Sequence, residues 1–455
     1  MTNTEQNKKE MLGTAPVGKL LLRLALPTVV AQLINMLYNI VDRIYIGHSP
    51  EVGDLALTGV GVCMPIIMIV SAFAAFASSG GAPRASIFLG KGEREEAERT
   101  LGGCVALQLV ISALLTAVLL LFARPVLLAF GASDYTLPYA LRYMRIYAVG
   151  TLFVQLTLGC NAFLTAQGKT RVAMASVLIG AVCNLVLDPI LIYACDMGVA
   201  GAAIATVISQ GLSCLYALSH LLGRGEGLAI RARYLRLSPS VVLPCLALGS
   251  AFFVMQASES VIAVAFNTSL RSFGGDVAVG AMTILTSVMQ LALLPVNGVA
   301  QGAQPILGYN FGAKNAARVK ATFRLLLFVC LGYTMTVFLL VMCFPRLFPA
   351  IFTSDPALLD FTAGVIRTYF LGVGIFGIQV ACQMTFVSLG QSLSSVTVAV
   401  VRKFVLLLPL IYLVPHMVAD PLYGVYLAEP IADIVAVTFT AVLFAFRFRR
   451  VLKNM

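Results

Sequence analysis

Two carboxylates within long apolar stretches are the residues best placed to do chemistry. Asp42 lies in the apolar run 26–48 and Asp188 in the run 171–194. A charged side chain within hydrocarbon costs a few kcal/mol or more, so an acid in such a run predicts a functional site. Two acids close together in a low dielectric cannot easily both ionise, so the pair could carry a proton. The same oxygens could instead bind Na⁺, and the sequence leaves both possibilities open.

Polar side chains accompany each acid at helical spacing. Tyr38 precedes Asp42 by four residues and Asn184 precedes Asp188 by four, so each pair shares a helix face. Counting about 1.5 Å per residue from the expected helix ends places both acids and Thr206 roughly 9 to 12 Å below the outer surface. We therefore predict an ion-coupling cluster of Tyr38, Asp42, Asn184, Asp188 and Thr206. Four of these side chains are also the candidate Na⁺ ligands: Asp42, Asn184, Asp188 and Thr206.

Two neighbouring residues bear on this cluster. Arg43 could neutralise Asp42, but it points about 100° away around the helix and can extend its charge outward. Pro189 follows Asp188 directly and lacks a backbone donor, so we expect a kink that frees a carbonyl near the acids.

The second half of the chain holds a further set of candidates. Glu259 occupies the position that corresponds to Asp42, and either binds a cationic substrate or forms a buried hydrogen bond between helices. The positions that correspond to Asn184 and Asp188 are Leu406 and Leu410, so ion coupling is predicted in the first half. Glu429 and Asp433 form another pair with helical spacing, and we consider them weaker candidates. The residues that we expect to contact substrate are Asn35, Asn161, Met255, Gln256, Glu259 and Gln383.

The composition is that of a polytopic membrane protein. Hydrophobic residues make up 59% of the chain and charged residues 11%, about half the charged fraction of a soluble domain. A helix needs about 20 apolar residues to cross a bilayer, and the long uncharged runs meet that requirement. The short alternating segments of a membrane barrel are missing. The net charge of +11 is explained by membrane topology, so we expect no nucleic-acid partner.

Several chemistries are disfavoured by what the sequence lacks. No phosphate-binding loop motif occurs, so ATP is not expected to be the direct energy source. The three histidines and ten cysteines are scattered, which indicates neither a metal site nor a catalytic triad. The polar amino terminus has no apolar signal segment, so we expect no cleaved leader. We predict a protein that is not an enzyme and uses no cofactor beyond its coupling ion.

Twelve transmembrane helices are predicted, six in each half. We expect an amino-terminal lobe over residues 1–222, a cytoplasmic linker over 223–240, and a carboxy-terminal lobe with a basic tail over 241–455. The expected helices cover residues 19–47, 54–83, 98–123, 138–165, 171–194, 198–222, 241–268, 276–306, 316–343, 358–388, 394–416 and 421–446.

The distribution of basic residues predicts the orientation. With twelve helices, 24 of the 31 lysines and arginines fall on the side that holds both termini, including Arg402 and Lys403. Because cytoplasmic loops are enriched in Lys and Arg, both termini are predicted to be cytoplasmic.

The two halves also resemble each other in sequence. At offsets of 217 to 222, Asp42 aligns with Glu259, Arg145 with Arg367, Tyr147 with Tyr369, and Gly168 with Gly390. Six helices per repeat is an even number, so both halves enter the membrane from the same side and are related by a pseudo-twofold axis along the membrane normal. Such halves could rock about a central cavity and give alternating access.

These residues together resemble a known family. The run LYNIVDRIYIGH, followed by ALTGVGV and GGAPRASIFLGKG, is similar to the multidrug and toxic compound extrusion (MATE) transporters, in particular their MepA-type bacterial branch. The resemblance covers essentially the whole chain. It implies export of amphipathic, often cationic organic compounds in exchange for H⁺ or Na⁺, with coupling at the amino-lobe cluster. The chain departs from the NorM-like branch, because the run 368–386 of its tenth helix has Gln379 and Gln383 but no acid.

Three hypotheses follow for the activity. The leading one is an antiporter of the bacterial cytoplasmic membrane that acts as a monomer among membrane lipids and exports small organic cations. The second is a flippase for a lipid-linked saccharide, which would need a cationic cavity, whereas intramembrane Arg and Lys are scarce. The third is a receptor or scaffold without transport activity, which would leave the buried acids and the repeat unexplained.

Overall fold

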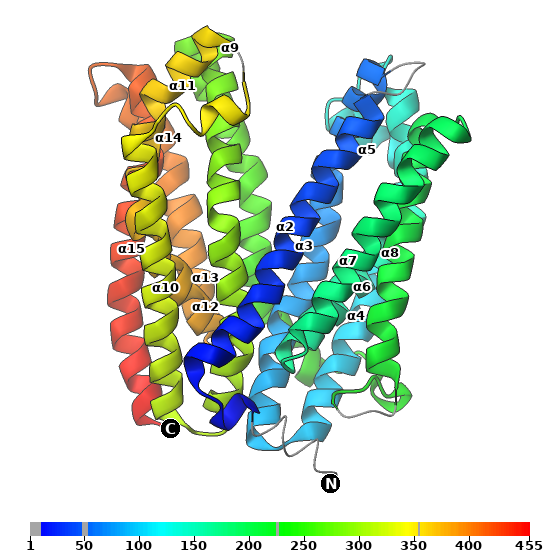
Figure 1. Ribbon diagram of the computed structural model, residues 1–455, viewed down its shortest axis with the longest axis vertical. Coiled ribbons are helices and arrows are strands. Elements are labelled where there is room, and N and C mark those ends of the chain that lie inside the picture. The colour runs from blue at the N-terminus through cyan, green and yellow to red at the C-terminus, as the bar shows by residue number, and fades with distance from the viewer. Residues whose placement is uncertain (1–10, 48–52, 224–226, 354) are drawn as a thin grey trace.

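The structure is a computed structural model that describes residues 11–47, 53–223, 227–353 and 355–455. Every regular element in these ranges is helical, as the composition predicts. The helices form two bundles, one from each half of the chain (Figure 1). The bundles lie close together near the two termini and diverge towards the opposite end of the molecule.

The amino lobe contains six long helices and two short elements. Their bounds agree with the predicted spans to within a few residues, except that the second helix continues two turns further than expected. The elements are α2 (Val17–Gly47), α3 (Gly53–Lys91), α4 (Arg94–Leu121), the short α5 (Ala123–Ala129), α6 (Leu137–Ala166), α7 (Thr170–Pro189), the π-helix η1 (Ile190–Ala194) and α8 (Gly198–Leu222). The α-helical geometry of α7 ends at Pro189, which confirms the predicted break beside Asp188.

The carboxy lobe repeats this plan with more interruptions. Asn315, Asp355 and Asp420 cap the starts of three of its helices by accepting backbone N–H groups. The elements are η2 (Ala232–Tyr234), α9 (Pro239–Gly312), α10 (Ala316–Cys343), η3 (Pro349–Ile351), α11 (Pro356–Tyr369), α12 (Val373–Ser388), α13 (Ser392–Val400), the π-helix η4 (Val401–Leu407), α14 (Leu408–Leu413), η5 (Val414–His416) and α15 (Pro421–Lys453).

The helix count agrees with the predicted twelve spans. Ten helices in the described ranges are long and apolar enough to cross a membrane. One of them, α9, consists of two helices joined at Gly275, where φ is 64° and the helical geometry breaks. A further span is the pair α11 and α12, which meet at 55°.

The lobes meet at closely packed helix crossings that have the symmetry of the repeat. A Cβ atom on Gly90 of α3 would lie 1.9 Å from the carbonyl oxygen of Tyr309, and one on Gly312 of α9 would lie 2.0 Å from that of Ile87. Gly90 and Gly312 are repeat-related positions, as are Ile87 and Tyr309, so the crossing lies on the pseudo-twofold axis. Only glycine permits two backbones to approach this closely.

The amino-terminal segment packs on the opposite lobe. The Arg318 side chain of α10 donates hydrogen bonds to the carbonyl oxygens of Leu12 (3.1 Å) and Ala15 (2.9 Å). Leu20 and Leu24 at the start of α2 are buried in the same apolar cluster as Leu326 of α10. Helix α2 therefore begins against the carboxy lobe, although its sequence belongs to the amino-terminal repeat.

Candidate functional site

The two amino-lobe acids lie together, as predicted. Asp42 of α2 is 5% exposed and Asp188 of α7 is fully buried. Their carboxyl groups interact directly with each other. The amide nitrogen of Asn184 donates to Asp188 Oδ1 at 3.2 Å, one helical turn away on the same face. Burial and mutual contact therefore create the paired-acid environment that a proton carrier needs.

Tyr38 connects the acids to their surroundings. Its half-buried phenol group lies beside Asp42, Asp188 and Gln210 of α8. Thr206 lies one turn earlier on α8, where its hydroxyl donates to the Ala202 carbonyl oxygen at 2.9 Å. The predicted coupling residues are thus brought to one part of the amino lobe. The side chain of Arg43 lies outside the described part of the chain, so its proposed neutralisation of Asp42 stays untested.

Two tyrosines of α6 join this cluster, and sequence reasoning missed them. Tyr143 is buried and lies beside Tyr38, Asp42 and Thr206. Its ring stacks on that of Tyr147, with centroids 6.2 Å apart. The one available sequence signal was the alignment of Tyr147 with Tyr369 in the repeat. Tyr369 also lies beside acids, namely Glu429, Asp433 and Glu259.

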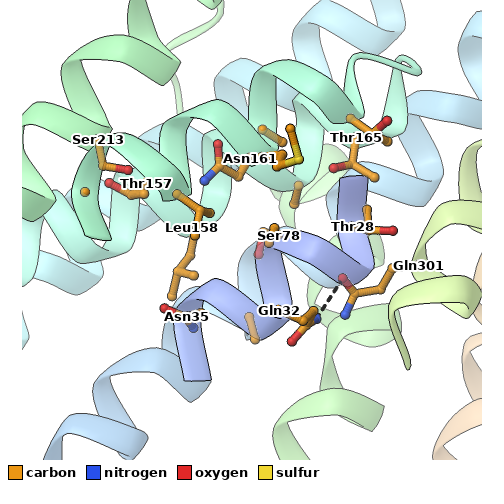
Figure 2. A pocket seen from close by; sticks show the side chains of 18 of the residues that line it. Thr28, Gln32, Asn35, Ser78, Thr157, Leu158, Asn161, Thr165, Ser213 and Gln301 are labelled. Atoms are coloured by element: carbon orange, nitrogen blue, oxygen red, sulfur yellow. Dashed lines mark hydrogen bonds between the residues drawn. The ribbon is translucent and has the colours of Figure 1, made fainter. Parts of the chain in front are cut away.

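A cavity of about 350 Å³ adjoins the acids. It is lined by α2, α3, α6, α7 and α8 of the amino lobe, together with residues of α9 and α12. Asn35 and Asn161, both predicted to contact substrate, line it, and so does Tyr38. Figure 2 shows α2 side chains such as Gln32 and Asn35 opposite the α6 side chains Thr157 and Asn161. Tyr38 therefore borders both the cavity and the acid pair.

One hydrogen bond joins the lobes at the cavity wall. The amide nitrogen of Gln32 on α2 donates to the side-chain oxygen of Gln301 on α9, at 3.2 Å (Figure 2). Nearby, the Thr28 hydroxyl donates to the Gly298 carbonyl oxygen at 2.7 Å. Residues of both lobes thus close this side of the cavity.

The other predicted substrate residues are not among the residues that line this cavity. The Gln383 amide donates instead to the Ser395 hydroxyl at 2.6 Å and so ties α12 to α13. Its neighbour Met384 lines the cavity in its place. Met255 and Gln256 lie on α9 away from it, and Glu259 belongs to a separate charged cluster.

That charged cluster lies within the carboxy lobe. The Lys403 ammonium group is 2.7 Å from the Glu259 carboxylate. The Arg402 guanidinium group donates to Asp433 at 2.8 Å and to Glu429 at 3.3 Å, and it lies 4.5 Å from the centre of the Phe376 ring. Lys403 is thus the ion-pair partner of Glu259. The cluster contains three acids and two bases.

The positions of Arg402 and Lys403 correct the sequence-based topology. Both were assigned to a cytoplasmic loop. The structure places them about ten residues inside the span Ser392–His416, at the start of the π-helix η4. Lys403 is 4% exposed. A buried cation is retained here because acids from α9 and α15 surround it.

Comparisons with known proteins agree with this architecture. The model of the MatE family matches residues 27–190 and again residues 251–413. The chain is 23% identical over 425 residues to the multidrug export protein MepA of Staphylococcus haemolyticus, with 92% of each chain covered. It is 25% identical over 429 residues to the FAD transporter of Shewanella oneidensis, with 92% of this chain and 93% of that protein covered.

A solved structure described as MATE in the bent conformation superposes with a TM-score of 0.92. It has 22% identity and covers all of this chain and 99% of its own. The two family matches cover most of the chain, one in each lobe. The resemblance to MATE proteins of the MepA type is therefore confirmed, together with a multi-pass cell-membrane architecture. The chain belongs to the MatE family of membrane transporters.

Proposed function

We propose that this protein is an antiporter that exports amphipathic organic compounds and takes up H⁺ at the Asp42–Asp188 pair. One observation supports the proposal most strongly. Tyr38 borders the acid pair on one side and, with Gln210, lines the cavity on the other. A change in the protonation of the acids therefore alters the hydrogen bonding of a cavity wall. That contact is the physical basis for coupling ion movement to substrate release.

The side-chain contacts favour H⁺ over Na⁺ as the coupling ion. Two buried carboxyl groups side by side repel each other when both are ionised, and a proton on one of them removes that repulsion. Among the four candidate Na⁺ ligands, Asn184 presents its amide nitrogen to Asp188, and the Thr206 hydroxyl is engaged with a backbone carbonyl. These bonds use donor hydrogens and leave the Asn184 amide oxygen and the Thr206 lone pairs to a cation, so the preference for H⁺ rests on the paired acids. Na⁺ coupling remains the alternative that the experiment must separate.

The lobe contacts suggest which side of the membrane the cavity reaches. The glycine crossings and the Gln32–Gln301 bond hold the lobes together, whereas the bundles diverge away from the termini (Figure 1). If both termini are cytoplasmic, as the basic residues predict, the described state is open towards the outside. Uptake of H⁺ into this state would release the exported compound outward before the lobes close on that side.

The flippase hypothesis gains little from the intramembrane cations. Arg402 and Lys403 lie in the membrane, contrary to expectation, but they are engaged by Glu259, Glu429 and Asp433. A pyrophosphate group would have to displace these acids. Relatives of comparable identity are named for multidrug export and for FAD transport, so identity alone does not choose the substrate.

Efflux in proteoliposomes tests the proposal. A pH gradient alone should drive substrate export, and a Na⁺ gradient alone should not. Asp42→Asn and Asp188→Asn should each reduce proton-driven export at least tenfold. Asp134→Asn, an exposed aspartate of the same lobe, is the matched control and should export at the wild-type rate. Export that responds to Na⁺ alone, or wild-type export by Asp42→Asn, would overturn the H⁺ assignment.

A further inference from the structure

The cavity has an unusual chemical character for a site that binds organic cations. Its described lining residues carry no Asp, Glu, Lys, Arg or His. More than half of them offer hydroxyl or carboxamide groups, contributed by α2, α3, α6, α7, α8 and α9. The remaining surface is small or apolar, with Phe252, Leu158 and Met174 as the larger side chains. Recognition in this space depends on uncharged hydrogen bonding.

Two polar atoms of the wall have no hydrogen-bond partner within the described protein. They are Asn161 Oδ1 on α6 and Ser209 Oγ on α8. Ser209 is 3% exposed, and both residues line the cavity. A buried polar atom left without a partner costs about 1–3 kcal/mol. Both atoms are buried, so a ligand reaches them after small shifts of the wall side chains; one that donates to Asn161 and exchanges a hydrogen bond with Ser209 then removes that cost.

A lipophilic cation gains less binding free energy from this cavity lining. Moving a charge out of water is costly unless an opposite charge or several dipoles receive it. The acids closest to the cavity, Asp42 and Asp188, lie behind the Tyr38 ring and contact each other. The lining thus offers hydrogen-bond partners but no counter-charge of its own.

We propose that the cavity binds an uncharged polar group, such as an amide-bearing heteroaromatic ring with hydroxyl substituents, and that Asn161 and Ser209 recognise it. This proposal rests on the proposed transport function and specifies the substrate class for the same cavity. A volume of about 350 Å³ accommodates a small ring system with its polar substituents. Phe252 and Met384 from the carboxy lobe supply apolar contacts for the ring.

Equilibrium binding with two fluorescent probes tests the substrate class. Riboflavin is an uncharged heteroaromatic amide with hydroxyl groups, and ethidium is a lipophilic cation that also has three fused rings. Asn161→Leu should weaken riboflavin binding at least tenfold and change ethidium binding less than threefold. Ser209→Ala removes one oxygen atom and should weaken riboflavin binding about fivefold. Because this change is so small, it keeps the test valid if Asn161→Leu fails to fold.

Matched controls lie outside the cavity. Asn267→Leu on α9 and Ser219→Ala on α8 replace exposed residues of the same types and should leave both affinities unchanged. Asn161→Asp adds the charge that the lining lacks and should improve ethidium binding while weakening riboflavin binding. Ethidium binding that depends on Asn161 and Ser209, or riboflavin binding indifferent to both, would overturn the assignment.

The binding assay needs no ion gradient, so its result separates the two proposals. Riboflavin binding that depends on Asn161, without proton-driven export, would retain the substrate class and reject the antiport mechanism. Proton-driven export of ethidium alone, with riboflavin bound by neither wild type nor variants, would retain antiport and reject the substrate class.

Discussion

The ammonium nitrogen of Lys403 lies 2.7 Å from a carboxylate oxygen of Glu259, but the two side chains differ greatly in exposure. The Lys403 side chain is 6% exposed and the Glu259 side chain is 58% exposed. An ion pair of this kind joins a buried base to an acid that reaches the surface. Removing Glu259 therefore leaves a buried ammonium group, whereas removing Lys403 leaves a carboxylate at the surface.

Loss of the acid should destabilise the protein more than loss of the base. Glu259→Gln leaves a buried ammonium group with weaker compensation, at a cost of about 3 kcal/mol. Lys403→Met leaves an exposed carboxylate, and the cost should stay below about 1 kcal/mol. The double variant should recover most of the loss. Thermal unfolding of the four proteins in detergent measures the difference, and equal losses in both single variants would contradict the prediction.

Tyr38→Phe should separate coupling from binding. The change removes the phenol group between the acid pair and Gln210 but keeps the ring that lines the cavity. We expect proton-driven export to fall about tenfold, the effect of losing about 1.4 kcal/mol of polar interaction beside the acid pair. Substrate affinity without a gradient should change less than threefold. Parallel measurements of export and equilibrium binding test this, and a proportional loss of both would assign Tyr38 to binding alone.

Alanine at either side of the central helix crossing should have the same effect. Gly90→Ala and Gly312→Ala each place a methyl group within about 2 Å of a backbone oxygen of the opposite lobe. Such overpacking costs about 1–3 kcal/mol. Gly332→Ala on α10 is the control, because a Cβ atom there meets nothing within 4 Å. It should stabilise its helix by about 0.5–1 kcal/mol. Unfolding temperatures report both effects, and unequal losses at the crossing would argue against its symmetry.

The linker should respond to alkaline pH through one tyrosine. The Tyr234 hydroxyl donates to Glu95 at the start of α4, and this hydrogen bond raises the pKa of Tyr234 above its usual value. The contact needs the protonated phenol, so it is present below the ordinary tyrosine pKa and is lost as pH rises through the raised value. Absorbance titration of tyrosinate in wild type and Tyr234→Phe isolates this group. If the absorbance difference between the two proteins titrates with an ordinary midpoint, near pH 10, the hydrogen bond is not formed.

The sequence was sufficient to predict the transmembrane spans, because the apolar runs that indicate them are local features of the chain. Long uncharged runs specify where helices cross the bilayer, and the acids of α2 and α7 could be placed at one depth by counting residues from the helix ends. The pairing of Asp42 with Asp188 follows from that shared depth and from helix packing. Pro189 likewise predicted the interruption at the end of α7.

Contacts between distant helices were harder to predict. The rule that assigns Lys and Arg to the cytoplasmic side cannot recognise bases that acids from other helices neutralise within a span, as happens at Arg402 and Lys403. The orientation of the Gln383 side chain on α12 depends on its hydrogen bond to Ser395 on α13. Tyr143 stands between Arg142 and Arg145 in a run with further tyrosines, so nothing in the sequence distinguished it from its neighbours.

Helix α2 has its two ends in different lobes. Leu20 and Leu24 pack in the carboxy-lobe core, whereas Asp42 and Ile46 are buried among the amino-lobe helices, so α2 lies obliquely between the bundles (Figure 1). Any rotation of one lobe against the other must bend, slide or turn this helix. Because Asp42 lies on this same helix, movement of one lobe against the other changes the position of the Asp42 side chain directly.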